Sequence, residues 1–258
     1  MLVWLSMNDA EKETVAFGFS DVAPDEKPVL VREIFSSVAS RYDLMNDLMS
    51  GGVHRLWKDA FVDWLNPQPG MAVLDLAGGT GDIAFRIAAR LKAKGGEGRI
   101  TICDINLAML EQGVKRPQAL DDSIAWVCGD AHNLPVEDSS QDAYTIAFGI
   151  RNTTHLEDVL DEAYRVLRPG GRFLCLEFSR VAAPGLDRLY DLYSFSVLPR
   201  LGELVAGDGA AYRYLAESIR RFPSQRAFAK AIGEAGFDQV KYRNLSGGIA
   251  AMHSGWKV

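Results

Sequence analysis

Three features are scarce in this sequence: cysteines, long apolar runs and an excess of basic residues. Its three cysteines, Cys103, Cys128 and Cys175, lie far apart, without the spacing of a zinc site or a redox pair. We therefore expect buried, reduced thiols. No apolar run approaches the roughly 20 residues that a spanning helix needs, and residues 1–7 lack the basic region of a signal peptide. These absences favour a cytoplasmic protein.

The charge balance and the histidines argue against two further classes of protein. Acidic residues outnumber basic ones by 34 to 28, for a net charge of −6. Nucleic-acid-binding proteins usually carry net or clustered basic charge, so we expect no nucleic-acid partner. The four histidines, His54, His132, His155 and His253, show no metal-ligand spacing and are expected to be structural. We therefore predict no metal site.

What the sequence does contain is enough apolar material for one large core, because 48% of its 258 residues are hydrophobic. Residues 1–28 include a polar stretch with two prolines, which predicts a flexible N-terminal arm. Residues 29–258 form one predicted domain. Within it, we interpret residues 29–66 as an N-terminal helical cover and residues 184–220 as a helical insertion or lid.

From residue 71 onward, strand-like runs alternate with helical periodicity, and short loops connect them. Such alternation predicts a doubly wound α/β fold with a parallel sheet. The last two strand-like runs meet at residues 246–248, and a close pair with a tight connection is antiparallel. The predicted strands are 71–76, 99–104, 124–128, 142–148, 172–178, 237–244 and 248–257, and the helices among them are 82–94, 106–116, 155–167 and 224–235.

A glycine-rich turn joins the first of these strands to the first of these helices. Gly78, Gly79 and Gly81 fall within four positions, between the apolar run 72–76 and the helical run from Asp82. Glycine permits positive φ angles and leaves room for a ligand, and the free amides at the start of a helix point toward such a turn. The turn therefore predicts a nucleotide-like cofactor at this edge of the sheet.

Two classes of cofactor fit this turn. Residues 79–84 match the dinucleotide pattern G-x-G-x-x-[GA], a weak signal alone, and Asp104 after the second strand suits ribose hydroxyls in either class. Asp75 precedes the turn, Asp82 lies where a pyrophosphate would bind, and Asp130 suits an adenine amine. S-adenosylmethionine (SAM) carries a positive sulfonium and no phosphate, so these carboxylates favour it. An NAD-dependent reductase is the alternative.

A set of short motifs runs from residue 17 to the C-terminus. The most distinctive are Tyr42–Ser50 and Tyr212–Ile219, whereas the glycine turn marks only a superfamily. The others are Phe17–Phe19, His54–Lys58, Leu74–Asp82, Phe148–Asn152, Arg165–Gly171, Leu176–Ser179, Tyr193–Phe195 and Val197–Arg200. In these motifs the chain resembles the UbiE family of ubiquinone/menaquinone biosynthesis C-methyltransferases, which are class I SAM-dependent methyltransferases.

The resemblance implies a Rossmann-like fold with a doubly wound seven-stranded sheet of order 3-2-1-4-5-7-6, in which strand 7 is antiparallel. It implies SAM as cofactor and C-methylation of a polyprenylated quinol ring in ubiquinone or menaquinone biosynthesis. The acceptor is then 2-polyprenyl-6-methoxy-1,4-benzoquinol, demethylmenaquinol or both, and the alternative is another small apolar molecule. A peripheral membrane contact, a homo-oligomer and a biosynthetic complex stay open.

The predicted cofactor site combines the residue pattern with the resemblance. The resemblance implies Thr80 in the turn, Asp104 on the ribose, and Asp130 with Ala131 near the adenine. A further family position, often a serine, is Ala147 here, and its methyl side chain cannot donate that hydrogen bond. The full predicted cofactor set is Asp75, Gly79, Thr80, Gly81, Asp104, Ile105, Asp130, Ala131 and Ala147.

Catalysis requires the acceptor carbon about 3 to 3.5 Å from the methyl group, in line with the breaking bond. Catalytic candidates are Arg151 and Asn152, which follow the fourth strand, and Tyr42 from the cover. We predict that Arg151 stabilises the quinolate or orients a water, and that Asn152 positions the ring. The competing interpretations are an ion pair for Arg151, a turn for Asn152 and a core position for Tyr42. The apolar stripe of 184–220 predicts a sheet cover, an isoprenoid channel or a membrane-facing lid.

Overall fold

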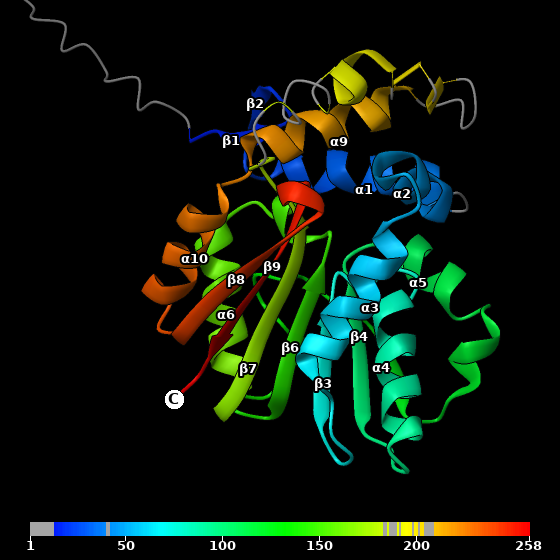
Figure 1. The fold of residues 1–258 in the computed structure, drawn as a ribbon, viewed down its shortest axis with the longest axis vertical. Helices are drawn as coiled ribbons and strands as arrows, with labels where there is room; N and C mark the ends of the chain where they lie inside the picture. Colours follow the sequence, from blue (N-terminus) through cyan, green and yellow to red (C-terminus); the bar gives the residue numbers. More distant parts are fainter. Residues whose placement is uncertain are drawn as a thin grey trace, which may run out of the picture.

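The computed structural model contains a seven-stranded sheet with helices on both faces (Figure 1). The strand order is β5-β4-β3-β6-β7-β9-β8, and β9 runs antiparallel to both of its neighbours. Counted along the chain, this confirms the predicted order 3-2-1-4-5-7-6 with an antiparallel seventh strand. The strands are β3 (Ala72–Leu76), β4 (Arg99–Asp104), β5 (Ile124–Cys128), β6 (Gln141–Ala147), β7 (Leu167–Phe178), β8 (Asp238–Leu245) and β9 (Ala250–Trp256). The structure describes residues 13–39, 42–182, 185, 190, 192–197, 199–200, 202–203 and 209–258.

Helices cover both faces of the sheet because its inner strands are apolar on both sides. Val73 belongs to the core under α3 and α4, whereas the next residue, Leu74, belongs to the core under α6 and α10. Phe61 on the first side and Phe228 on the second are completely buried. The helices of the two layers are α3 (His54–Leu65), α4 (Asp82–Ala93), α5 (Leu107–Gly113), α6 (Leu156–Val166) and α10 (Gln225–Glu234).

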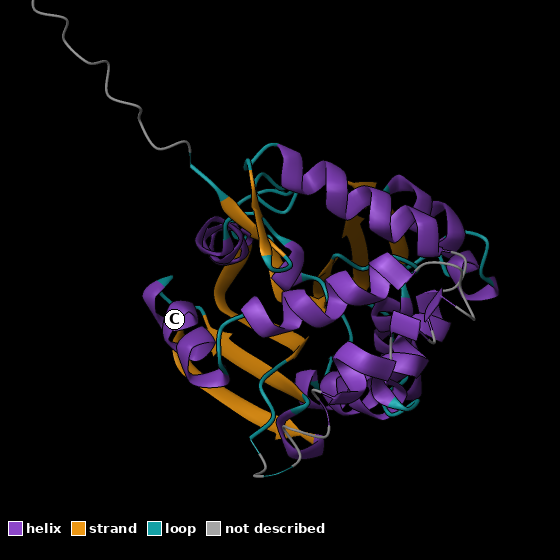
Figure 2. Ribbon diagram, turned by 90° about the horizontal axis from the view of Figure 1, so that it is seen from above, coloured by secondary structure: helices purple, strands orange, loops and turns teal. Residues whose placement is uncertain are grey.

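A helical cover lies over the carboxyl ends of the strands (Figures 1 and 2). It consists of α1 (Glu26–Val38), α2 (Tyr42–Ser50), α9 (Gly209–Arg221) and a π-helical turn (Tyr193–Val197). A short antiparallel hairpin, β1 (Val15–Phe17) and β2 (Ser20–Val22), packs against α9. Ligands of doubly wound sheets bind at the carboxyl ends of the strands, so the cover encloses the edge where a ligand is expected.

The N-terminal part of the chain differs from the predicted flexible arm. Within the described residues, positions 15–22 form the hairpin, and α1 begins at Glu26 rather than at residue 29. Gly18 turns the hairpin with a φ of 58°, and a Cβ there would lie 2.3 Å from Glu217 Oε2. Glycine is therefore needed both for the turn and for its close approach to α9. Residues 1–12 lie outside the described part.

The cysteines follow the prediction at two of three positions. Cys103 and Cys175 are buried, whereas Cys128 is exposed. Cys128 ends β5, which is an edge strand and has a neighbour on one side only. A strand-like pattern does not say which strand lies at the edge, and this is why the expectation for Cys128 was wrong.

The helical insertion predicted at 184–220 is described only in part. Its described elements are the turn from Tyr193 to Val197 and helix α9, and most of residues 183–208 lie outside the described part. No helix among the described residues is both long and apolar enough to cross a membrane.

Candidate functional site

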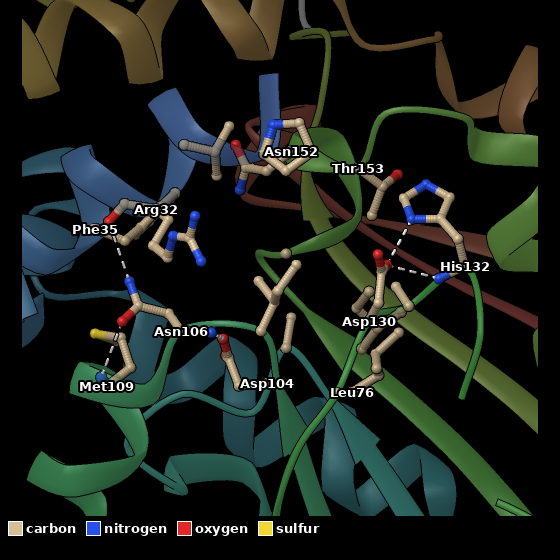
Figure 3. A pocket seen from close by; sticks show the side chains of 18 of the residues that line it. Arg32, Phe35, Leu76, Asp104, Asn106, Met109, Asp130, His132, Asn152 and Thr153 are labelled. Carbon is tan, nitrogen blue, oxygen red and sulfur yellow. Dashed lines mark hydrogen bonds and ion pairs between the residues drawn. The ribbon is translucent and has the colours of Figure 1, made fainter. Parts of the chain in front are cut away.

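A cavity lies at the carboxyl ends of β3, β4, β5 and β6, beneath α1 (Figure 3). Asp104 and Asp130 line it where β4 and β5 end, and Asn152 lines it in the turn that follows β6. One side of the cavity is therefore acidic, while the other presents an amide. The rest of the wall is mixed. Its polar side chains are Arg32, Asn106, His132, Thr153 and Thr154, and its apolar side chains are Val31, Phe35, Leu76, Met109, Ile146 and Phe148.

Asp104 ends β4 and is held by two backbone amides. Its Oδ1 accepts a hydrogen bond from Asn106 N at 2.8 Å, and its Oδ2 accepts one from Gly79 N at 2.9 Å. The residue is only 9% exposed, and this burial raises the pKa of its carboxyl to about 6. Each oxygen keeps further acceptor capacity toward the cavity. A pair of ribose hydroxyls would supply the hydrogen bonds that burial has removed.

Asp130 is oriented by its neighbour His132 (Figure 3). Its Oδ1 accepts hydrogen bonds from His132 N at 2.9 Å and from His132 Nδ1 at 2.7 Å. His132 Nε2 accepts from His155 N at 3.2 Å, so the ring proton is on Nδ1. Burial alone would raise the pKa of Asp130, but the hydrogen bonds from His132 outweigh it and lower the pKa. The carboxylate thus stays ionised, as an acceptor for an adenine amine must be.

The glycine turn approaches the cavity at Gly79. Besides donating to Asp104, Gly79 has a φ of 53°, and a Cβ there would lie 3.0 Å from Met109 Cε. Thr80 instead accepts a hydrogen bond from Arg116 at 3.3 Å through its hydroxyl. Gly81 packs against aromatic side chains of α4 and β5, where a Cβ would lie 2.8 Å from Trp126. Only the first part of the turn therefore approaches the cavity.

The predicted cofactor residues thus separate into two groups. Asp104, Ile105, Asp130 and Ala131 line the cavity, and Gly79 adjoins it through Asp104. The other four, Asp75, Thr80, Gly81 and Ala147, are not among its lining residues. Asp75 is buried under the turn, where it accepts a hydrogen bond from Thr145 Oγ1 at 2.7 Å. That burial raises the pKa of Asp75 to about 7.

From its position at the start of a helix, Asp82 was expected to repel a pyrophosphate, but in the structure its carboxylate is paired with two cations. Its carboxylate binds Lys58 Nζ at 2.7 Å and Arg86 Nη1 at 2.5 Å. Burial would raise the pKa of Asp82, but the charge and hydrogen bond of Lys58 and the charge of Arg86 lower it. Two cations thus neutralise the carboxylate, and Asp82 joins α3 to α4. Repulsion of a pyrophosphate by Asp82 is correspondingly weak, and the preference for SAM rests on the other residues.

Helix α1 forms the roof of the cavity and is tied down at two places. Asn106, the N-cap of α5, donates from Nδ2 to Arg32 O at 3.2 Å and to Ser36 Oγ at 3.1 Å. Lys27 Nζ donates to Thr153 O at 2.7 Å. Burial lowers the pKa of Lys27 to about 8. Access to the cavity from this side therefore requires α1 to move.

The predicted catalytic pair Arg151 and Asn152 lies in a 3-10 turn after β6, and the two side chains point to different places. Arg151 is buried, and its Nη1 binds Glu177 Oε1 at 2.7 Å and Phe148 O at 2.6 Å. It does not line the cavity, so the ion-pair interpretation is the one that the geometry supports. Asn152 does line the cavity, and its Oδ1 accepts from Tyr214 OH at 3.0 Å. Arg151 therefore holds the turn that presents Asn152.

Tyr42, the third catalytic candidate, begins α2, and its side chain lies outside the described part. Its role stays a prediction. The sequence reasoning missed Asn106 and Tyr214. An N-cap signal was available for Asn106, since asparagine precedes a helical run. Tyr214 lies within the motif Tyr212–Ile219, but no local pattern indicates its partner, which is 62 residues away.

Among the described residues, no group of histidine, cysteine, aspartate and glutamate side chains could hold a metal ion. The sheet order, the glycine turn and two carboxylates at the ends of β4 and β5 together define a class I SAM-dependent methyltransferase.

Comparison with known proteins places the chain within that class. Residues 21–257 match the model of the ubiE/COQ5 methyltransferase family, and the chain belongs to this family. A ubiquinone/menaquinone biosynthesis C-methyltransferase UbiE of Paracoccus denitrificans is 58% identical, covering 97% of this chain and 99% of that protein. The UbiE protein of a Ruegeria species is 53% identical over 98% of this chain and 100% of its own.

Solved structures agree at the level of the fold. A SAM-dependent methyltransferase from Thermotoga maritima, described as a possible histamine N-methyltransferase, aligns with a TM-score of 0.61 and 20% identity. That alignment covers 88% of this chain and 99% of the other. The phosphoethanolamine N-methyltransferase 2 of Haemonchus contortus, solved with SAM, aligns with a TM-score of 0.57 and 14% identity, covering 78% and 52% of the two chains.

Proposed function

We propose that this enzyme methylates a ring carbon of a polyprenylated quinol, in the biosynthesis of ubiquinone, menaquinone or both. The observation that carries the proposal is the distribution of side chains in the cavity. One end has the carboxyl groups of Asp104 and Asp130, and the other has the amide of Asn152 beside apolar side chains. The first end suits a nucleoside with a cationic sulfonium, and the second suits a ring with oxygen substituents. The family match over residues 21–257 supports the same acceptor.

The residues at the acidic end fit SAM. Asp104 would hold the ribose hydroxyls, because it is buried with only two amide donors. Asp130 would accept from the adenine amine, beside Ile105 and Ala131, and Gly79 would leave room for the methionine part. When bound, SAM supplies an electrophilic methyl group, whose carbon–sulfur bond breaks as the bond to the ring carbon forms.

At the other end, the chain has to hold the ring and favour its ionised form. An ionised ring hydroxyl makes the adjacent carbon nucleophilic, and the ring carbon loses its proton after the transfer. Asn152, Thr153 and Thr154 are polar residues that line the cavity there, and Phe148 offers an apolar surface beside them. Among these polar side chains, Asn152 presents an amide. Arg151 acts by holding the turn through Glu177.

The long apolar tail of such a substrate needs a route out of the protein. A second groove lies between the hairpin, α1 and α9, and its lining is mixed. Phe17, Ile34 and Tyr214 are apolar or aromatic, whereas Ser20, Arg200, Glu203, Arg213 and Glu217 are polar or charged. Tyr214 also contacts Asn152, so this groove lies close to the ring end of the cavity. We infer that the tail runs along it toward a membrane on the cytoplasmic side.

An exposed aromatic patch lies on the same cover. We define it as Phe19, Leu192, Phe195 and Val197, which are 54%, 61%, 38% and 40% exposed. The rings of Phe19 and Phe195 stack with centroids 5.9 Å apart, and the Arg220 guanidinium lies 5.9 Å from the Phe195 ring centroid. Aromatic and arginine side chains together suit a membrane interface. We infer that this patch contacts the bilayer that holds the substrate.

Quinone profiling by mass spectrometry in cells that lack the protein tests the acceptor. We expect accumulation of the demethylated benzoquinone precursor, of demethylmenaquinone, or of both, and restoration by the intact gene but not by the Asp104→Asn variant. An unchanged quinone profile in the deleted strain would overturn the proposal and leave another small apolar acceptor.

A further inference from the structure

Tyr214 connects the helical cover to the ring end of the cavity. Its hydroxyl donates a hydrogen bond to Asn152 Oδ1 at 3.0 Å, across a sequence separation of 62 residues. Asn152 lines the cavity, and Tyr214 lines the groove assigned above to the substrate tail. The contact therefore lies where the ring and its tail would meet.

The position of Tyr214 is itself tightly determined. The residue is 5% exposed, and its ring stacks on Phe17 of the hairpin with centroids 4.5 Å apart. Burial raises the pKa of its phenol above the ordinary value, so the hydroxyl keeps its proton at any physiological pH. On the other side, the buried Arg151–Glu177 ion pair holds the turn that carries Asn152. Both partners of the hydrogen bond are thus fixed by packing.

A donated hydrogen bond decides which way the amide of Asn152 points. An asparagine side chain has an acceptor oxygen and an NH₂ group with two donors. Because Oδ1 is engaged by Tyr214, Nδ2 is the part of the amide left for a ligand. We propose that Tyr214 is a positioning residue for methyl transfer, which fixes the amide of Asn152 so that its N–H groups face the acceptor oxygen.

This role rests on the proposed function. It requires a substrate whose ring hydroxyl ionises next to the Asn152 amide. An N–H donor stabilises an oxygen that carries negative charge more than a neutral hydroxyl. The fixed amide therefore lowers the pKa of the ring hydroxyl that it contacts and raises the fraction of reactive quinolate. A freely rotating amide would present its oxygen part of the time, and that oxygen would favour the unreactive neutral hydroxyl.

The test is Tyr214→Phe, which removes the hydroxyl but keeps the ring on Phe17. The matched control is Tyr212→Phe, which removes the hydroxyl of another buried tyrosine on the same helix. With a short-tailed quinol and SAM, we expect kcat for Tyr214→Phe to fall roughly tenfold, since one oriented hydrogen bond is lost. The Kd for SAM and the thermal unfolding temperature should match those of the control.

The pH profile separates positioning from a general structural effect. If the amide stabilises the quinolate, the acid limb of the kcat–pH profile should move about one unit higher in Tyr214→Phe, because tenfold corresponds to one pKa unit. A uniform drop at every pH, with no displacement of the limb, would overturn the assignment. So would an equal displacement in Tyr212→Phe.

A double-mutant cycle with Asn152→Ala distinguishes this inference from the proposed function. If Tyr214 acts through Asn152, Tyr214→Phe should have little further effect on kcat in the Asn152→Ala background. Additive losses would overturn the positioning role while leaving the proposed function intact. If Asn152→Ala alone keeps full turnover of the quinol, Asn152 does not contact the ring, and that part of the proposed function fails.

Discussion

Asp104 shows how one buried carboxylate prepares a binding site. Two backbone amides hold it at the end of β4, and burial raises its pKa to about 6. In the free protein, burial of the Asp104 carboxylate costs free energy, because the two amides do not replace all the hydrogen bonds that water would donate. A ligand that donates two hydroxyl hydrogen bonds removes that cost. Binding of such a ligand therefore favours the ionised form and depends on pH in a definite direction.

We predict that the affinity for SAM decreases as the pH falls through about 6, because the protonated carboxyl can accept fewer hydrogen bonds. Calorimetric titration of SAM between pH 5 and 8 measures this. Asp104→Asn should weaken binding about tenfold to a hundredfold and lose the dependence near pH 6. The surface variant Asp122→Asn should behave like the wild type. A wild-type Kd that is constant from pH 5 to 8 would contradict the prediction.

Among the elements, α1 governs access to the site. Its backbone and Ser36 accept hydrogen bonds from Asn106, and Lys27 near its start binds the turn after β6. The same asparagine caps α5, with Oδ1 accepting from Met109 N at 3.3 Å. One side chain thus joins the roof to the wall that carries Asp104, and loosening it should affect the cofactor.

We predict that Asn106→Ala weakens SAM binding about fivefold and speeds hydrogen exchange of the α1 amides, because a cap and two ties are lost at once. Ser224→Ala is the matched control, since Ser224 caps α10 through Ala227 N and is not among the residues that line the cavity. Ser224→Ala should lower the free energy of unfolding by about 1 kcal/mol, and Asn106→Ala should lower it by more, because two further hydrogen bonds are lost. Equal SAM affinities for the two variants would show that α1 does not depend on Asn106.

At the scale of the whole molecule, the two sides of the cover differ. Its inner side closes the cavity, and its outer side carries the aromatic patch of Phe19, Leu192, Phe195 and Val197. The hairpin connects the two sides, because Phe17 stacks on Tyr214 while Phe19 stacks on Phe195. A substrate with a polar ring and a bilayer-bound tail would be received on this side.

Flotation with phosphatidylcholine vesicles checks the membrane contact. We predict that wild-type protein floats with the vesicles at high salt, and that the Phe19→Ser/Phe195→Ser variant floats several-fold less, since each ring contributes apolar area. Leu120→Ser is the control, because Leu120 is 86% exposed in the 3-10 turn before β5, outside the cover. Failure of the wild type to float, with or without quinol, would remove the membrane contact from the proposal.

The sheet and the acidic end of the site follow from local patterns in the sequence. Alternating apolar strands and amphipathic helices specify a doubly wound sheet, and in such a sheet residues that follow parallel strands meet at one edge. Asp104 and Asp130 could therefore be predicted together from their places after two strands. The position of the glycine turn could also be predicted, because three closely spaced glycines between a strand and a helix are a local pattern.

Which side chains face the cavity depends on contacts that form only in the folded chain. Thr80 turns to Arg116 and Asp82 to Lys58, although both lie in the predicted turn. Arg151 and Asn152 are adjacent, yet one is buried in an ion pair and the other lines the cavity. The direction in which a side chain points changes from one residue to the next along a turn. It depends on interaction partners such as Glu177 and Tyr214, which come near only when the chain folds. Local sequence patterns do not indicate those distant partners, whereas their periodicity does predict strands and helices.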